Sequence, residues 1–551
     1  MLGKTEISHA ELETREDLAR ADRERDELNR IGIALSSTRD IGKLLEMILS
    51  KAREITNADA GSLYIVESSQ IDGGSSGQGD RRLRFKYTQN ASRQFPFTEG
   101  TIPLTENSMA GYAALHGEIV ALDDVYAIPP GRPYRFNSHF DQETGYRTRS
   151  MLTLPMKNPR GEVTGVVQLL NCKRNWEARL LTPEDWEREV QPFSSRSVNL
   201  AESLASQAAV AYENSRLYHG IEALFEGFVK ASVTAIEQRD PTTSGHSNRV
   251  ATMTLGLAEA MNRTGQGPYA QTRFTIEQLK EIRYAALLHD FGKVAVREEV
   301  LTKAKKLHPA ELMVVQHRFD YVRKYQEAEC ARKKFDVLLA RGPQAAHPEL
   351  ARIDEDYQRQ QAELDECQQF VVQLNEPRVL RGGSFEKLVD VARKTYRDPK
   401  GRECPLLTPD ELSSLSIPQG SLNDDERRQI ESHVTHSFNF LIQIPWTQEI
   451  KYIPWIARAH HEKLNGTGYP NRLRGDEIPV QAKMMSICDI FDALSAADRP
   501  YKKAVSIDRA LDILEMSVRD RELDPDLFQI FLEARIYDLA DSQSSAVSLV
   551  P

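Results

Sequence analysis

The chain has 551 residues, of which 40% are hydrophobic and 28% charged, and its formal net charge is −10. This composition is that of a folded globular protein, and the negative balance argues against a surface that coats nucleic acid. No stretch reaches the roughly 18 apolar residues of a membrane helix, and the N-terminus lacks the apolar core of a signal peptide. The five cysteines contain no CxxC pair, which favours a reducing, cytoplasmic location without structural disulfides.

The N-terminal part divides into a charged segment and a mixed domain. Residues 1–30 are highly charged with sparse leucines, which predicts an exposed or self-associating helix. Residues 31–199 begin with apolar residues at helical spacing from Ile41. Alternating or β-branched runs follow at 62–66, 83–87, 151–155 and 163–170. Helices combined with several strands predict an α+β sensor domain.

Residues 200–232 predict a long linker helix. Residues 196–232 contain no proline, and apolar residues keep the four-three spacing of a coiled-coil seam. The seam consists of Leu200, Leu204, Ala211, Tyr218, Ile221, Phe225 and Phe228. One interpretation is a helix packed on its own domain. The other is a parallel dimer helix that carries a signal between two domains.

Residues 233–541 show helical periodicity and no convincing strand. A stretch at about 309–419 differs from the rest, because its apolar residues follow heptads on both sides of Gly342-Pro343. This pattern predicts a helical hairpin that protrudes from an all-α bundle. The hairpin is either a solvated structural arm or a surface that binds a partner.

Histidine and aspartate residues recur within this helical region. Single histidines of this kind are usually exposed or satisfied in the core, but two adjacent pairs, His289-Asp290 and His460-His461, are harder to explain in that way. Buried carboxylates and imidazoles are costly unless a divalent ion neutralises and orders them. Imidazole combined with carboxylate suits Fe, Mn or Zn.

The segment His460-His461-Glu462-Lys463-Leu464-Asn465-Gly466-Thr467-Gly468-Tyr469-Pro470 resembles the signature of the HD-GYP phosphodiesterases. The resemblance extends to His289-Asp290-Phe291-Gly292-Lys293 upstream and to Asp489 and Arg499-Pro500-Tyr501-Lys502 downstream. It implies an α-helical bundle that hydrolyses cyclic di-GMP at a centre of two or three metal ions.

The resemblance also implies a role for each matching residue. The implied metal ligands are His246, His289, Asp290, His433, His460, His461 and Asp489, with Asp290 as the bridge between ions. The implied substrate contacts are Lys293, Gly468, Tyr469, Pro470, Arg499 and Lys502. Asp290 and Lys293 are the candidate catalytic residues.

Three positions depart from the family pattern or leave a choice. Members with three metals carry a glutamate where this chain has Thr242, so we expect two divalent ions, Fe or Mn. Asn465 replaces a common aspartate in the loop, where we expect little loss. His317 competes with His433 for the middle ligand, and we prefer His433 because its local sequence and its distance to His460 match better.

The N-terminal domain resembles a GAF domain of the cyclic-nucleotide-binding type. The matching stretches are Phe136-Asn137, Asp141–Leu152 and Gly165–Asn171. The resemblance implies that Asp141, Thr148 and Asn171 could face a ligand such as a cyclic nucleotide. A ligand-free dimerisation domain is the alternative.

Together these features predict a cytoplasmic metal-dependent phosphodiesterase. We expect it to hydrolyse cyclic di-GMP to linear pGpG or GMP under the control of its GAF domain, as a parallel homodimer without membrane insertion or DNA or RNA binding. One alternative substrate is 3′,3′-cyclic GMP-AMP. The other alternative is a sensor or interaction protein that binds nucleotide without turnover.

Overall fold

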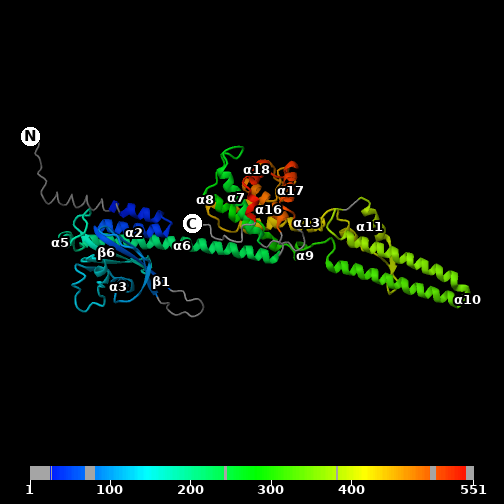
Figure 1. Cartoon of the computed structure of the whole chain (residues 1–551), viewed down its shortest axis with the longest axis horizontal. Coiled ribbons are helices and arrows are strands. Elements are labelled where there is room, and N and C mark those ends of the chain that lie inside the picture. The colour runs from blue at the N-terminus through cyan, green and yellow to red at the C-terminus, as the bar shows by residue number, and fades with distance from the viewer. Residues whose placement is uncertain are drawn as a thin grey trace, which may run out of the picture. The chain divides into compact units, whose positions relative to one another are not determined.

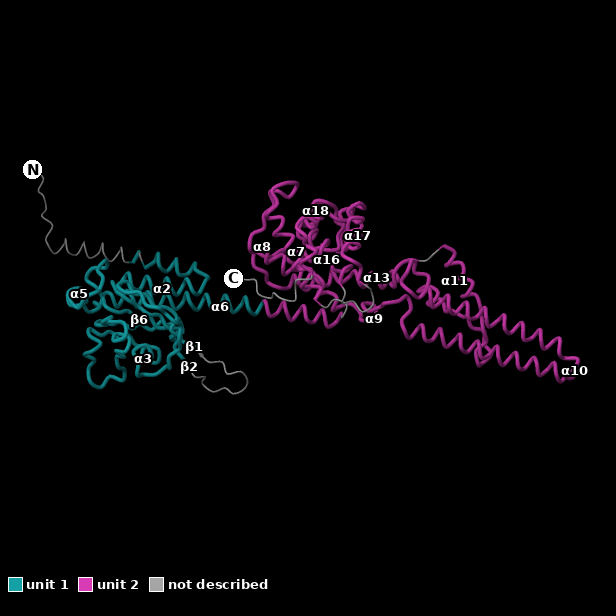
Figure 2. Tube along the Cα trace, viewed as in Figure 1, with its two compact units in different colours: residues 1–225 teal, residues 226–551 magenta. Residues whose placement is uncertain are grey.

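The computed structural model describes residues 25–26, 28–68, 81–240, 245–379, 382–496 and 504–540. They form two compact units, residues 1–225 and 226–551, shown in Figure 2. The helix predicted over residues 1–30 lies mostly outside the described residues. Within the described part of the chain, no helix combines the length and apolar character that crossing a membrane requires.

Unit 1 is built on an antiparallel sheet with the order β3-β2-β1-β6-β5-β4, and β7 pairs with β6. The strands are β1 Ala58–Ser68, β2 Arg81–Asn90, β3 Gly100–Pro103, β4 Val120–Leu122, β5 Met151–Lys157, β6 Val163–Lys173 and β7 Val190–Gln191. The helices are α2 Ile41–Thr56, α3 Met109–His116, α4 His139–Thr144 and α5 Pro183–Glu189, followed by α6 Ser195–Arg239, which continues into unit 2.

Alternation along the strands gives the sheet two buried faces. Val167 of β6 packs with α2 and the first half of α6, whereas its neighbour Val166 packs with α3. Figure 1 shows α2 and α6 on one side of the sheet and α3 on the other. This arrangement confirms the predicted α+β class of the N-terminal domain.

Over the first half of α6 the structure favours the interpretation of a helix packed on its own domain. Leu204 and Ala211 are buried in the core of unit 1 against α2, so they are not available to a partner helix. Further along the helix the exposed large apolar residues are Leu217, Tyr218, Ile221, Leu224 and Phe228. The sequence spacing is helical in both segments, and only the packing shows which face is covered.

Unit 2 is a helical bundle with a long insertion. The bundle consists of α7 His246–Arg263, α8 Ile276–Leu288, α9 Glu298–Leu301, α13 Asp424–Glu431, α14 His433–Leu441, α15 Ile453–Arg458, α16 Val480–Ser495, α17 Ile507–Arg519 and α18 Pro525–Glu533. Short 3-10 helices join them at η2 Phe291–Ala295, η3 Gln448–Ile450, η4 Gly475–Glu477 and η5 Ile536–Ala540. Helix α7 packs against α8 and α16, and α14 packs against α15 and η2.

The insertion is an antiparallel helical hairpin. Helix α10, Pro309–Leu374, reverses at Gly342, whose φ of 69° lies in the left-handed region. Arg323 bonds Asp365 across the hairpin at 2.6 Å, and Gln361 bonds Gln326 at 2.9 Å. Helices α11 Ser384–Arg393 and α12 Pro409–Leu415 pack at its base through a shared apolar core. Figure 2 shows α10 and α11 at one end of unit 2.

A short hairpin corrects the prediction that residues 233–541 lack strands. Strand β8, Thr395–Arg397, pairs with β9, Glu403–Pro405, in antiparallel register. Two three-residue strands are too short to produce a visible alternation in the sequence, so helical periodicity around them concealed the pair.

Candidate metal centre

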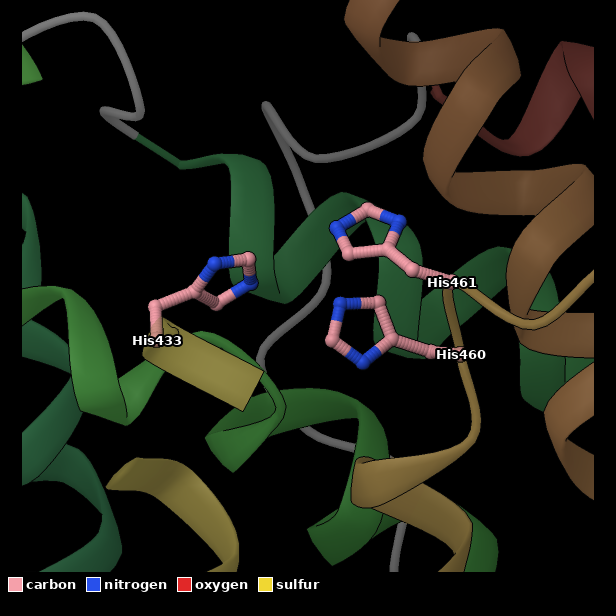
Figure 3. Close-up of side chains that lie close together, drawn as sticks. All are labelled: His433, His460 and His461. Atoms are coloured by element: carbon pink, nitrogen blue, oxygen red, sulfur yellow. The ribbon is translucent and has the colours of Figure 1, made fainter. Parts of the chain in front are cut away.

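The seven predicted ligands come together in the core of unit 2. His246 begins α7, His289 and Asp290 follow α8, and His433 begins α14. His460 and His461 follow α15, and Asp489 lies within α16. Figure 3 shows the imidazole of His433 facing the adjacent rings of His460 and His461. The packing of five helices therefore gathers donors that are as many as 243 residues apart in the sequence.

The two carboxylates lie between the imidazoles. Asp290 presents Oδ1 at 3.2 Å from His433 Nε2 and Oδ2 at 3.4 Å from His289 Nε2. Asp489 presents Oδ1 at 3.1 Å from His246 Nε2 and Oδ2 at 3.9 Å from His461 Nδ1. Each carboxylate thus faces two groups of donors, which is the arrangement of a bridging ligand.

The orientation of three imidazoles leaves unprotonated nitrogen atoms directed into this cluster. Nδ1 of His289, His433 and His460 lies 2.5–2.6 Å from the carbonyl oxygen three residues earlier. Because a carbonyl only accepts, each Nδ1 donates its proton there, and in the neutral ring Nε2 keeps a lone pair. Among the described residues, these three buried Nε2 atoms have no hydrogen-bond partner.

Lone pairs that face carboxylate oxygens at 3.2–3.4 Å repel one another unless a cation lies between them. Backbone carbonyls that fix imidazole tautomers in this way are common behind metal-binding histidines. Three groups of donors have atoms within 4.8 Å of one another: His433-His460-His461, His246-His289-Asp290 and His289-His460-Asp489. The buried donors therefore fit divalent metal ions.

The pKa shifts of His460, His461 and Asp290 agree with metal binding. Burial and the neighbouring imidazoles hold the pKa of His460 well below its ordinary value, and burial is the main cause that lowers the pKa of His461 to about 3. Burial opposes ionisation of Asp290, but Lys293 and His289 outweigh it and hold its pKa well below the usual range. Neutral imidazoles and ionised carboxylates are the donor set that Fe, Mn and Zn accept.

Asp492 is a functional residue to which the sequence analysis assigned no role. Its Oδ2 lies 2.7 Å from His246 Nδ1, and Arg249 Nε donates to its Oδ1 at 2.6 Å. Burial lowers the pKa of His246, but Asp489 and Asp492 together raise it to about 9. Helical spacing could have indicated this role in the sequence, because Asp492 lies three residues after Asp489 on α16 and therefore near the same face of the helix.

Gly292 and Ser437 bring η2 against α14. Ser437 Oγ donates to the carbonyl of His289 at 2.6 Å and accepts from Gly292 N–H at 2.8 Å. A Cβ atom on Gly292 would lie 1.9 Å from the carbonyl oxygen of His433. This close approach places Asp290 beside His433, and only glycine allows it.

The loop after His461 is held by a buried glutamate. Glu462 accepts the backbone N–H groups of Asn471 at 2.7 Å and Leu473 at 2.9 Å. Gly468 is buried so tightly that a Cβ atom would lie 2.4 Å from the nitrogen of Lys463. The centroid of the Tyr469 ring lies 4.8 Å from that of the His461 ring, and Pro470 is the next residue in this loop.

The other predicted site residues fall in different places. Lys293 Nζ lies 2.7 Å from Asp290 Oδ2. Thr242, Arg499 and Lys502 lie outside the described residues. His317 is exposed on α10, whereas His433 is in the cluster. Asn465 Nδ2 donates to the carbonyl of Asp520 at 3.1 Å, and Asn465 Oδ1 accepts from Thr467 N–H at 3.0 Å.

The residues predicted to face a ligand in unit 1 bond mainly to the protein itself. Thr148 Oγ1 donates to Asp141 Oδ1 at 2.9 Å, and Tyr126 donates to Asp141 Oδ2 at 2.9 Å. Asn171 is fully buried, accepts from Arg149 N–H and donates to the carbonyl of Arg147. The polar atoms of Thr148 and Asn171 therefore hold the segment before β5, and the expected ligand contacts of these residues stay a prediction.

Asp141 alone of these three lines a hollow of 350 Å³, with Tyr126, Gln142, Gly145, Tyr146 and Arg147. A neighbouring hollow of 360 Å³ shares Tyr126 and includes Arg132 and Phe136.

The fold and the site thus define a mixed sensor-like domain joined to a helical domain with a candidate metal centre. Comparison with known families assigns both. The GAF domain family matches residues 40–212, and HD domain families match residues 243–340 and 405–527. The chain therefore contains a GAF domain followed by HD-domain segments, and all seven clustered donors lie inside the HD matches.

Curated relatives match parts of the chain. The 3′3′-cGAMP-specific phosphodiesterase 3 of Vibrio cholerae is 39% identical over 21% of this chain and 24% of the relative. The cyclic di-GMP phosphodiesterase response regulator RpfG of Xanthomonas campestris is 35% identical over 22% of this chain and 32% of the relative. The chain thus spans a quarter to a third of the length of these relatives.

Among solved structures, the GAF domain of Acinetobacter phosphoenolpyruvate-protein phosphotransferase matches 36% of this chain and 98% of its own chain. That match has 16% sequence identity and a TM-score of 0.26.

Proposed function

We propose that the protein is a metal-dependent phosphodiesterase that hydrolyses cyclic di-GMP to linear pGpG or GMP. The observation that carries the proposal is the convergence of seven donors in which buried Nε2 lone pairs face Asp290 and Asp489. The named activities of the relatives that match this chain support the same reaction class.

We propose that the donor set holds two divalent ions, Fe or Mn. His246, His289, Asp290 and Asp489 would hold one, and Asp290, His433, His460 and His461 the other, with Asp290 shared. When bound, such ions neutralise charge on phosphoryl oxygens and acidify a coordinated water. The chain's own contribution is to fix these donors through Asp492, Ser437 and the three carbonyl-bonded imidazoles.

The substrate would approach over the loop that follows His461. Lys293 supplies an ammonium beside Asp290 for a phosphate oxygen. Tyr469 offers a flat face beside His461, and Gly468 and Pro470 shape the same loop. Arg499 and Lys502 remain proposed phosphate contacts on the basis of sequence resemblance.

The test is product analysis with protein loaded anaerobically with Fe²⁺ or Mn²⁺. Cyclic di-GMP should give linear pGpG or GMP in chromatography, and metal-stripped protein should give neither. Absence of cleavage by fully loaded protein, with tight nucleotide binding retained, would support the non-catalytic sensor instead.

The relatives named as 3′3′-cGAMP-specific favour that dinucleotide as the second candidate substrate. Parallel incubation with 3′3′-cGAMP decides between them by the ratio of kcat/KM values.

Regulation by unit 1, a parallel homodimer and a cytoplasmic location complete the proposal. The domains proposed are an N-terminal helix 1–30, a GAF domain 31–199, a linker 200–232 and an HD-GYP domain 233–541 with its insertion at about 309–419. All five cysteines are unpaired, which suits a reducing compartment.

The proposed dimer seam lies in the middle of α6, where Leu217, Ile221 and Leu224 are 54–76% exposed at four-three spacing. A cyclic nucleotide is the proposed GAF ligand, with Asp141 at the hollow as its candidate contact.

A further inference from the structure

The last turns of α6 belong to the core of unit 2, close to the metal centre. Val229, Val233 and Ile236 are buried, with exposed fractions of 1%, 5% and 0%. Phe440 lies between Phe228 of α6 and Phe291, the residue after Asp290, with ring centroids 6.2 and 3.9 Å away. The end of α6 therefore packs beside the segment that carries Asp290.

The last turn of α6 forms hydrogen bonds with two segments that flank the metal centre, one before His246 and one after η2. Glu237 Oε1 accepts the N–H of Gly245, the residue before His246, at 2.9 Å. Arg239 Nη2 donates to the carbonyl of Val296, just beyond η2, at 3.3 Å. A displacement of this turn would strain both segments that carry metal ligands.

Asp240, the first residue after α6, reaches the site itself. It is 3% exposed, and its N–H donates to the carbonyl of Ile236 at 2.9 Å, so its backbone continues the helix. Its Oδ2 lies 3.6 Å from Lys293 Nζ, which also lies 2.7 Å from Asp290 Oδ2. Lys293 is thus held between two carboxylates.

The carboxylates of Asp290 and Asp240 would interact differently with Lys293 once metal ions are bound. Bound divalent ions would engage the charge of Asp290 and would repel the ammonium of Lys293, so Asp240 would be the carboxylate that remains to hold this ammonium. The Lys293 side chain is only 16% exposed, and an ammonium that is largely removed from water requires a counter-charge. Without Asp240 the ammonium would turn toward solvent.

We propose that Asp240 is a positioning residue that holds Lys293 toward the substrate phosphate, so that the end of α6 sets the location of this ammonium. The inference rests on the proposed function, since it assigns Lys293 a phosphate contact. It adds a physical connection from the linker helix to the substrate side of the metal centre.

The experiment measures binding of a hydrolysis-resistant phosphorothioate analogue of cyclic di-GMP to metal-loaded full-length protein by calorimetry. Asp240→Asn should weaken binding roughly 5-fold, and Lys293→Met about 10-fold or more, which correspond to ordinary ion-pair energies. The double variant should bind within about twofold of Lys293→Met if Asp240 influences the substrate through Lys293. Additive losses, or tight binding by Asp240→Asn, would overturn the proposal.

Controls separate positioning from folding. Asp240→Glu keeps the carboxylate and should bind within about threefold of the wild type, and Glu222→Gln removes an exposed charge elsewhere on α6 without effect. Metal content should be unchanged in all variants, and each variant should still unfold in one cooperative transition. Inorganic phosphate is the second probe. If the wild type does not bind the dinucleotide, but the losses of phosphate affinity in the two single variants and the double variant are non-additive in the same way, the proposed substrate is wrong and the positioning role of Asp240 stands.

Discussion

At the scale of single residues, the candidate metal centre depends on groups that hold the ligands as much as on the ligands. Three imidazoles are fixed by carbonyls and His246 is fixed by Asp492. The donor residues could be predicted from the sequence, because their types and order match a known motif. Asp492 was not assigned, because its role depends on a contact across 246 residues.

Replacement of the shared carboxylate should abolish metal binding. Asp290→Ala leaves the lone pairs of His289 and His433 without the anion that lies between them, so we expect loss of metal and at least a 100-fold loss of turnover. Elemental analysis and product chromatography check both. Retained turnover would contradict the assignment of the site.

Replacement of the supporting carboxylate should have a smaller effect. Asp492→Asn removes the charge that orients His246 and should weaken metal affinity about 10- to 100-fold. Metal competition with a chelator measures this change. Asp526→Asn, on the first turn of α18, is the matched control and should bind metal as the wild type does.

At the scale of elements, the centre requires η2 to pack directly on α14. The helical elements around it could be predicted from periodicity, whereas their close approach could not, since a glycine in a motif does not reveal which backbone it meets. Gly292 meets the carbonyl of His433.

Gly292→Ala tests this contact. The added methyl group cannot fit at 1.9 Å from a carbonyl oxygen, so η2 must shift, with a loss of about 2–4 kcal/mol in the free energy of unfolding. Denaturant unfolding measures the loss. Gly265→Ala, where no atom lies within 4 Å, should change stability by less than about 0.5 kcal/mol; an equal loss in both variants would contradict the packing argument.

At the scale of the whole molecule, α6 takes part in both units. Its first half is buried against α2, its middle exposes Leu217, Ile221 and Leu224, and its end packs in unit 2. The exposed middle is the surface that we propose joins two copies of the chain.

Charges in this seam should prevent dimer formation. Ile221→Glu with Leu224→Glu places like charges between the two helices, and we expect a monomer by light scattering at concentrations where the wild type is a dimer. Lys230→Glu, an exposed change on the same helix, should leave the dimer intact. A dimer that persists in the double variant would locate the interface elsewhere.

The sequence by itself determined the two domain classes, the helical hairpin and the seven donor residues, because these depend on local periodicity and on motifs with recognisable spacing. Only the tertiary structure decided which face of α6 is buried, that Asn171 and Thr148 bond within unit 1, and that Asp492 lies against His246 and Asp240 lies beside Lys293. These facts depend on contacts between residues far apart in the chain, and such contacts leave no periodic trace in the sequence. The charge balance illustrates the same division, since the net charge of −10 belongs to the whole chain, whereas the site depends on a few buried groups.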